Sequence, residues 1–156
     1  MPNLFPRRRD ILFGGLALAV TAPLIAQSRP ALHVAKDPGC GCCNSWARIV
    51  YDSGFDVTYE HRSNAALERF KLARSIPPAM FSCHTAEVEG YVIEGHVPPA
   101  DIWRLLALRP DAVGLSVPGM PYGSPGMGPE SERDAYSVML MRRDGSAEVF
   151  AHYPPA

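Results

Sequence analysis

Four cysteines in this 156-residue chain lie between positions 40 and 83, and three of them fall within four consecutive residues. The tetrad Cys40-Gly41-Cys42-Cys43 contains a C-x-x-C pair, a C-x-C pair and a vicinal pair. The fourth cysteine, Cys83, is followed directly by His84. Thiolates and imidazoles bind soft metals, and C-x-x-C is also the spacing of a redox dithiol. The two motifs therefore indicate either metal binding or thiol–disulfide chemistry.

The vicinal cysteines favour one kind of metal site over another. A mononuclear zinc site usually takes its ligands from two separated knuckles, and the adjacent side chains of Cys42 and Cys43 cannot easily point at one tetrahedral ion. Thiolate sulfurs can instead bridge two metals each, and low-coordinate thiolate sites suit monovalent copper. The spacing favours a multinuclear Cu(I) cluster, with a structural disulfide pair and a structural zinc site as the alternatives.

The order of elements is expected to bring the two cysteine motifs together. Residues 32–36 form a predicted strand, and after an Asp-Pro-Gly turn the apolar pattern is helical from Cys43 until Gly54. The tetrad then lies at the start of a helix, where backbone N–H groups and the helix dipole favour thiolates. A strand predicted at residues 85–88 starts just after Cys83, and we expect that start to lie beside the helix N-terminus.

The rest of the sequence predicts one α/β domain. Further strands are predicted at residues 55–59, 91–94, 136–142 and 147–152. Two more helices are predicted, one capped by Ser63 or Asn64 and one from Pro98 to Leu108. Ten of the 21 residues in 109–129 are Pro or Gly, so no regular element is predicted there. This order predicts a small mixed sheet flanked by helices, with an added C-terminal β-hairpin.

Residues 1–28 are predicted to be an export signal rather than part of the fold. Three arginines, Arg7–Arg9, form a basic start, and no charged residue follows between Ile11 and Ser28. The run Arg8–Leu12 also resembles a twin-arginine signal. A retained membrane anchor is the competing interpretation, although glycines and a proline interrupt the apolar run.

Cleavage is expected after Ser28, with Ala26 as the alternative position. The mature domain, residues 29–156, would then work in the periplasm, without stable membrane insertion, where cysteines normally become disulfides. A protein exported by the twin-arginine route would instead fold first, in a compartment that keeps its thiols reduced.

Composition argues against several function classes. The chain has 15 basic and 16 acidic residues and a formal net charge of −1, whereas nucleic-acid binding needs a concentrated basic surface. The sequence shows no Ser-His-Asp order, no phosphate-binding glycine loop and no paired carboxylates. Neither nucleic-acid binding nor acid–base hydrolysis is predicted, and no catalytic side chain is assigned.

Five segments carry a resemblance to a known family. They read PGCGCC, SCHT, GYVIEGHVP, GLSVPGMP and GSPGM, at residues 38–43, 82–85, 90–98, 114–121 and 123–127. Through these segments the chain resembles the CopG-type family of periplasmic copper-resistance proteins, metal-binding proteins with C-x-C-C and C-H motifs. The resemblance spans essentially the whole mature domain.

The resemblance implies a thioredoxin-like fold and a role in copper tolerance, with other periplasmic copper-resistance proteins as partners. It also implies copper bound through the cysteines, and an interconversion of Cu(I) and Cu(II). The residues that match the family's metal-binding positions are Cys40, Cys42, Cys43, Cys83 and His84.

Other residues with copper-binding side chains are weighed against ordinary packing roles. Met120 and Met127 lie in the Pro/Gly-rich segment and suit either Cu(I) ligation or an apolar groove. His96 follows Glu94-Gly95 near a helix start, and a structural hydrogen bond is favoured over metal ligation. Trp46 is predicted to pack on the core beneath the cysteines. The histidines without ligand spacing to the cysteines are His33, His61 and His152.

Two functions remain open at this point. The first is a copper-handling protein that holds Cu(I) in the cysteine cluster, as an oxidoreductase if the cluster cycles electrons and as a sink or carrier if it does not. The second is a periplasmic thiol–disulfide oxidoreductase in which Cys40 attacks and Cys43 resolves. The extra thiols of Cys42 and Cys83 argue against the second function, because they would trap wrong disulfides.

Overall fold

The computed structural model describes residues 28–156. The predicted export signal therefore lies, except for Ser28, outside the described residues and stays a prediction. In residues 28–156 no helix is long and apolar enough to cross a membrane.

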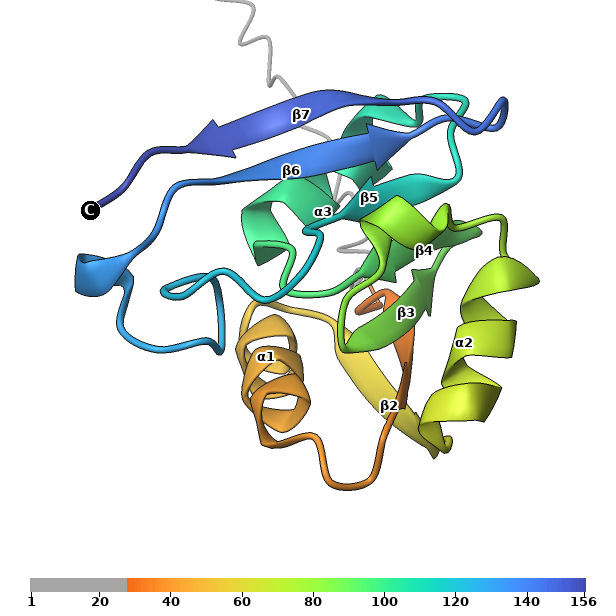
Figure 1. Cartoon of the computed structure of the whole chain (residues 1–156), viewed down its shortest axis with the longest axis horizontal. Coiled ribbons are helices and arrows are strands. Elements are labelled where there is room, and N and C mark those ends of the chain that lie inside the picture. Colours follow the sequence, from red (N-terminus) through yellow and green to blue (C-terminus); the bar gives the residue numbers. More distant parts are fainter. Residues whose placement is uncertain (1–27) are drawn as a thin grey trace, which may run out of the picture.

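The described residues form seven strands and three α-helices (Figure 1). In chain order they are β1 (Ala31–Lys36), α1 (Gly41–Asp52), β2 (Asp56–His61), α2 (Asn64–Leu72), β3 (His84–Val88), β4 (Tyr91–Glu94), α3 (Pro99–Leu108), β5 (Gly114–Ser116), β6 (Tyr136–Met141) and β7 (Ala147–Tyr153). Short 3-10 turns occur at Pro78–Met80 and Glu130–Glu132.

All seven strands join one mixed sheet in the order β2-β1-β3-β4-β5-β6-β7. Strand β1 runs parallel to β2 and antiparallel to β3, and β3 and β4 form a hairpin. The sheet order β2-β1-β3-β4 is compatible with the thioredoxin-like core that the family resemblance implies. Strands β6 and β7 form the predicted C-terminal hairpin and extend the sheet at the β5 edge.

Helices cover both faces of this sheet. Trp46 and Val50 of α1 and Ile102 of α3 belong to the main core cluster, together with Val34 of β1. The next residue of β1, Ala35, faces the other way and packs with Leu67 and Phe70 of α2. The predicted mixed α/β fold with flanking helices is confirmed. The face of β1 that carries α1 is the one on which the cysteines lie.

Helix α1 begins at Gly41, two residues before the start that the apolar pattern predicts. Its inward side chains are those that the periodicity singles out: Cys43, Trp46, Ala47 and Val50. Gly54 lies just beyond its end with φ +106, which side chains rarely adopt, and its N–H donates to Tyr51 O. The earlier start places Cys42 and Cys43 in the first turn of the helix.

The prediction that residues 109–129 hold no regular element is wrong. Gly114–Ser116 form β5, which pairs parallel to β4 and antiparallel to β6. A Cβ atom on Gly114 would lie 1.8 Å from Val92 O, so the close strand pairing requires a glycine there. The Pro and Gly content of the segment predicted an irregular loop, but long-range pairing with two strands overrides that local tendency.

Candidate metal centre

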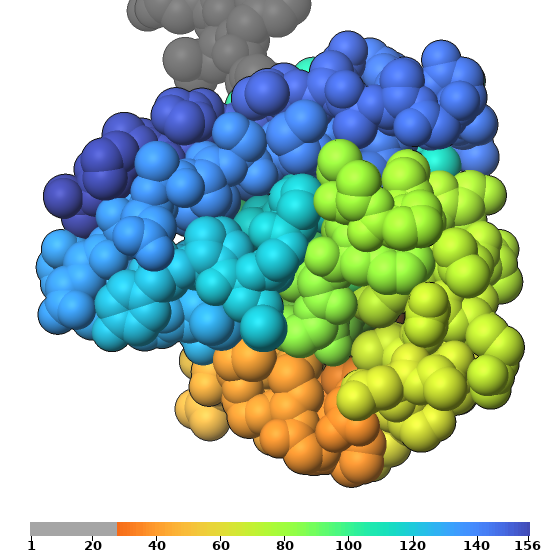
Figure 2. Space-filling view, viewed as in Figure 1, coloured from red at the N-terminus to blue at the C-terminus, as the bar shows by residue number. Residues whose placement is uncertain are grey.

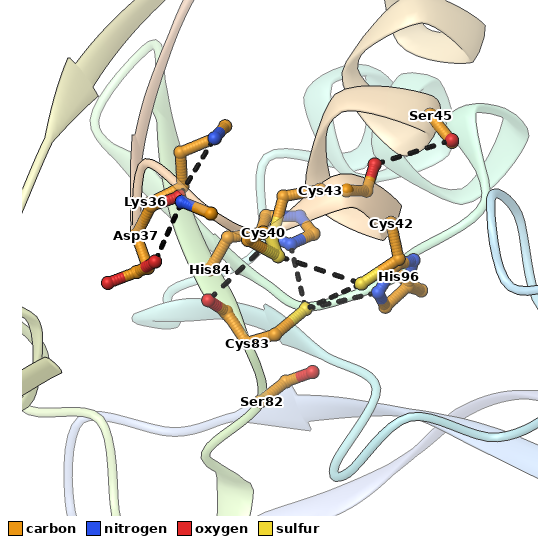
Figure 3. The surroundings of a disulfide bond; sticks show 12 residues. Lys36, Asp37, Cys40, Cys42, Cys43, Ser45, Ser82, Cys83, His84 and His96 are labelled. Atoms are coloured by element: carbon orange, nitrogen blue, oxygen red, sulfur yellow. Dashed lines mark hydrogen bonds between the residues drawn. A yellow bond between two sulfur atoms is a disulfide. The ribbon is translucent and has the colours of Figure 1, made fainter.

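The two cysteine motifs meet at the N-terminus of α1 (Figure 3). Cys40 is the N-cap residue, Cys42 and Cys43 lie in the first turn, and Cys83 immediately precedes β3. The ligand atoms of all four cysteines lie within 4.8 Å of one another. The structure therefore brings Cys83 to the tetrad, as the order of elements predicts.

Cys40 and Cys43 form a disulfide, whereas Cys42 and Cys83 are free thiols. The Cα atoms of Cys40, the N-cap residue, and Cys43, the third residue of the helix, lie 5.4 Å apart, within the usual range for a disulfide. Cys42 Sγ lies 3.6 Å from Cys40 Sγ and 3.9 Å from Cys83 Sγ. The sequence favours a fully reduced site, but in this structure two electrons must be added before all four sulfurs can act as thiolates.

Two imidazoles complete the cluster. Cys83 Sγ lies 3.3 Å from His84 Nδ1 and 3.1 Å from His96 Nε2. The ligand atoms of Cys83, His84 and His96 also lie within 4.8 Å of one another. His96 Nδ1 donates to Pro125 O at 2.8 Å, which leaves Nε2 as the nitrogen that faces the sulfur.

Sequence reasoning assigned His96 a structural hydrogen bond and missed its place beside Cys83. The hydrogen bond exists, and the same ring also faces the cluster. The register of the β3–β4 hairpin could have shown this, because Thr85 pairs with Glu94 and the residues just beyond that pair lie side by side. His33, His61 and His152 belong to neither ligand cluster among the described residues.

His84 is fully buried and faces the aromatic core. Its ring centroid lies 4.3 Å from that of Trp46, whose indole donates to Val97 O at 2.9 Å. Burial, and then the nearby charges of His96, Lys71 and Lys36, hold the pKa of His84 well below its usual value. The imidazole is neutral, and among the described residues its buried Nε2 has no hydrogen-bond partner. Trp46 lies beneath the site, as predicted, and limits access of water from the core side.

The environment of Cys83 stabilises the thiol rather than the thiolate. Burial, followed by the neighbouring Cys42 sulfur, raises the pKa of Cys83 to about 12. Cys83 lies outside α1, so the helix-start argument that favours thiolates in the tetrad does not extend to it. A metal that binds this sulfur must displace its proton.

Glu94 holds the residues on both sides of Cys83-His84. Its Oε1 accepts the Ser82 backbone N–H at 2.6 Å and its Oε2 accepts the Thr85 hydroxyl at 2.6 Å. The Lys71 ammonium of α2 pairs with the same carboxylate and donates to Thr85 Oγ1 at 2.9 Å. Burial raises the pKa of Glu94, an effect that Lys71 opposes. This buried network fixes the backbone that presents Cys83.

We expect Glu94→Gln to destabilise the protein by about 2–4 kcal/mol, because it leaves the Lys71 ammonium buried without a carboxylate. Urea unfolding followed by circular dichroism measures the change. The matched control is Glu89→Gln, which removes an exposed partner of Arg109 and should cost little. Equal destabilisation by the two substitutions would contradict a special role for the buried pair.

The Pro/Gly-rich segment closes over the start of α1. A Cβ atom on Gly126 would lie 2.6 Å from Trp46 N, so this loop touches the helix backbone. Gly119 N–H donates to Phe81 O, and Ser82 Oγ donates to Gly119 O. Met120 is exposed and Met127 is half-buried. Copper binding by these two methionines stays a prediction.

Solvent reaches the cluster through an open groove of about 370 Å³. Cys40 and Cys83 line it, together with Asp37, Glu68 and Phe81. A larger pocket of about 640 Å³ beside Trp103 contains no cysteine. Figure 2 shows the molecular face that carries the tetrad segment and the Pro/Gly-rich loop side by side. The groove, rather than the larger pocket, adjoins the reactive sulfurs.

This fold and site define a mixed α/β protein with a sulfur-rich centre of the kind that binds soft metals. Two solved structures, "Copper resistance protein copG- Form 2" and "Copper resistance protein copG- Form 1", are each 44% identical to the chain with a TM-score of 0.74. The first match covers 81% of this chain and 99% of that chain, and the second covers 80% and 97%. The chain belongs to the CopG family of copper-resistance proteins.

A family model described as "Protein of unknown function, DUF411" matches residues 80–127. This range includes the Cys-His motif, β4 and the Pro/Gly-rich segment. A comparison with curated proteins finds no match.

Proposed function

We propose that this protein is a periplasmic copper-resistance protein that holds several Cu(I) ions in a site bridged by cysteine thiolates. The observation that carries the proposal is the placement of four sulfurs within 4.8 Å of one another. Soft thiolate ligands select Cu(I), and vicinal cysteines suit bridging better than a single tetrahedral ion. The family membership supports copper as the metal.

The donor set fits this metal. Cys40, Cys42, Cys43 and Cys83 would bind copper after reduction of the disulfide, with His84 as a terminal ligand or as a neighbour that tunes the sulfurs. His84 is buried and neutral, and its Nδ1 lies 3.3 Å from Cys83 Sγ, which suits a ligand on the same side as the sulfurs. His96 Nε2 faces the same sulfur and would add a second imidazole.

Bound copper would supply one-electron chemistry, so that the protein could interconvert Cu(I) and Cu(II). The chain's own residues would then hold the ion while its charge changes, with Trp46 excluding water from below. The basic start and uncharged run of the N-terminal segment support export to the periplasm. Other periplasmic copper-resistance proteins would donate or accept the copper ions.

The experiment is an anaerobic Cu(I) titration of the reduced mature domain, residues 29–156. We expect more than one copper ion per chain, measured by metal analysis and by the absorption of the copper–thiolate bonds. Cys83→Ser should lower the number bound, whereas Ser146→Ala in the distant β6–β7 turn should not. One copper ion or none in the wild type would contradict the multinuclear site.

We expect Cu(I) affinity to rise with pH. Cys83 carries its proton at neutral pH, because its pKa is raised to about 12, so copper binding to this sulfur releases that proton. Copper binding to Cys83→Ser should release about one proton fewer, so its affinity should depend less steeply on pH. Chelator competition at pH 6, 7 and 8 measures both slopes. Identical slopes would show that Cys83 is not a ligand.

The Cys40–Cys43 disulfide favours one alternative function, a thiol–disulfide oxidoreductase. Cys40 lines the open groove while Cys43 is buried, so an external thiol would meet Cys40 first. Insulin reduction by the double variant Cys42→Ser/Cys83→Ser tests this function. Full activity in that variant would favour the oxidoreductase over the copper protein.

A further inference from the structure

The four sulfurs of the site form a continuous series, each close to the next. The series begins with the Cys40–Cys43 disulfide and continues with the free thiols of Cys42 and Cys83. Cys42 Sγ lies 3.6 Å from Cys40 Sγ on one side and 3.9 Å from Cys83 Sγ on the other (Figure 3). The Cys42 sulfur is therefore the link between the disulfide and the last thiol.

These separations suit thiol–disulfide exchange, in which one sulfur attacks a disulfide and another sulfur leaves it. Reactive groups held about 3–3.5 Å apart are placed for bond formation, and the two sulfur separations lie close to that range. No large movement of the chain is needed before the Cys42 sulfur can reach the disulfide.

The backbone holds these sulfurs in place. Cys40 is the N-cap residue of α1, and Cys42 lies in the first turn of the same helix. On the other side, the buried carboxylate of Glu94 accepts the Ser82 N–H at 2.6 Å and so fixes the residue just before Cys83. The two motifs are thus presented to each other by ordered elements, which keeps the sulfurs in reach of one another.

The surroundings of Cys43 suit it as the sulfur that leaves. Cys43 is fully buried, and its Sγ lies 3.8 Å from the carbonyl oxygen of Cys83, which can accept a hydrogen bond from a released thiol. Cys43 also lies in the first turn of α1, where backbone N–H groups and the helix dipole stabilise a thiolate. The released sulfur is therefore stabilised in either form.

We propose that Cys42 is an exchange thiol that passes the disulfide from the Cys40–Cys43 pair to Cys83. In the first step the Cys42 sulfur bonds to Cys40 Sγ, the bond to Cys43 breaks, and Cys43 takes the electron pair and the proton that Cys42 gives up. In the second step the Cys83 sulfur bonds to Cys42 Sγ, the bond to Cys40 breaks, and Cys40 takes the electron pair and the proton of Cys83. One disulfide and two thiols are present throughout, so neither oxidant nor reductant is consumed.

The exchange gives the protein a second disulfide isomer, in which Cys42 and Cys83 are bonded and Cys40 and Cys43 are the free thiols. Each of the four sulfurs then becomes available in turn to a metal ion or to the thiol of a partner, at a constant number of electrons. The two extra thiols thus act as a path along which the disulfide moves. This property belongs to the metal-free protein and does not depend on copper binding.

The test uses metal-free protein that carries one disulfide and two thiols. The protein is labelled with N-ethylmaleimide and then unfolded in acid, where exchange stops because the thiolates are protonated. Mass spectrometry of peptides locates the labels in molecules that carry two of them. A fixed disulfide leaves only Cys42 and Cys83 open to the reagent, whereas exchange also gives molecules labelled at Cys40 and Cys43.

Two variants separate the steps. Cys42→Ser removes the link, so the disulfide should stay in place and only Cys83 should be labelled. Cys83→Ser allows the first step alone, so Cys43 should be labelled in addition to Cys42, and Cys40 should not. The labelled fractions should be the same at low and at high protein concentration, because the exchange occurs within one chain.

Labels at Cys40 and Cys43 in the wild type, both lost in Cys42→Ser, would support the proposal. Labels confined to Cys42 and Cys83 in the wild type would overturn it. Labelling of Cys40 in Cys42→Ser, or a labelled fraction that rises with protein concentration, would overturn it as well. Failure of the proposed function would show instead in the Cu(I) titration, and it would leave the labelling result unchanged.

Discussion

Protein with an intact Cys40–Cys43 disulfide is expected to bind far less Cu(I) than the same protein after reduction. The disulfide removes two of the four sulfurs from the ligand set and leaves Cys42 and Cys83, 3.9 Å apart, beside two imidazoles. Bridged Cu(I) sites need thiolates, and neither sulfur of a disulfide is one. We expect the number of copper ions bound per chain to fall by at least about half.

Anaerobic titration of reduced and of oxidised protein, with a thiol count on each sample, measures this difference. Cys43→Ser is the control, because it cannot form the disulfide and loses one ligand only. After reduction its copper binding should be lower than that of reduced wild type. The thiol count shows whether Cys40, whose Sγ lies 3.6 Å from Cys42 Sγ, has formed another disulfide in the untreated variant. Equal binding by oxidised and reduced wild type would show that Cys40 and Cys43 are not copper ligands.

Gly126→Ala is expected to destabilise the protein by about 2–4 kcal/mol. Gly126 has φ +83, and a Cβ atom there would lie 2.6 Å from the backbone nitrogen of Trp46. The loop would have to move away from α1, and with it Pro125, whose carbonyl holds the His96 ring. We therefore also expect altered copper–thiolate absorption in the variant that remains folded.

The Pro-Gly-Met sequence occurs twice, at residues 118–120 and 125–127, and the first copy supplies a matched control. Gly119 occupies the corresponding position in the first Pro-Gly-Met segment and also has a positive φ, of +70, but no heavy atom lies within 4 Å of its Cβ position. Gly119→Ala should therefore cost only about 1 kcal/mol, from backbone strain alone. Urea unfolding of both variants measures the difference. Equal losses would mean that contact between the loop and α1 contributes little to stability.

Local pattern was sufficient for much of the fold and for the sulfur ligands. Helical spacing from Cys43 to Val50 marked the inward face of α1, and alternation marked most strands to within a few residues. The sequence does not predict β5, because glycine usually weakens a strand. In the structure a glycine is required at position 114, where β5 lies against Val92. Pairing with distant strands, and not the local residues, decides that element.

In the candidate site, too, short spacings predicted some features and long-range contacts decided the others. The C-x-x-C spacing and the turn before α1 placed three cysteines at a helix start, and the element order brought Cys83 to them. The residues next to His96 in sequence predicted only a structural hydrogen bond for it. Its contact with Cys83 depends on the β3–β4 hairpin and on a carbonyl 29 residues away. The pairing of Cys40 with Cys43, which leaves Cys42 free, was one of several possible within the tetrad.

By itself the sequence determined the chemistry available to this protein: four sulfurs and an adjacent imidazole, on a mixed α/β domain. These follow from residue types and short spacings, which act within a turn of helix or a single strand. The tertiary structure decided what surrounds the sulfurs: His96 beside Cys83, Glu94 paired with Lys71, and the buried Lys36 just before the start of α1. Burial and pairing of these side chains depend on elements far apart in the chain, so no local pattern could reveal them.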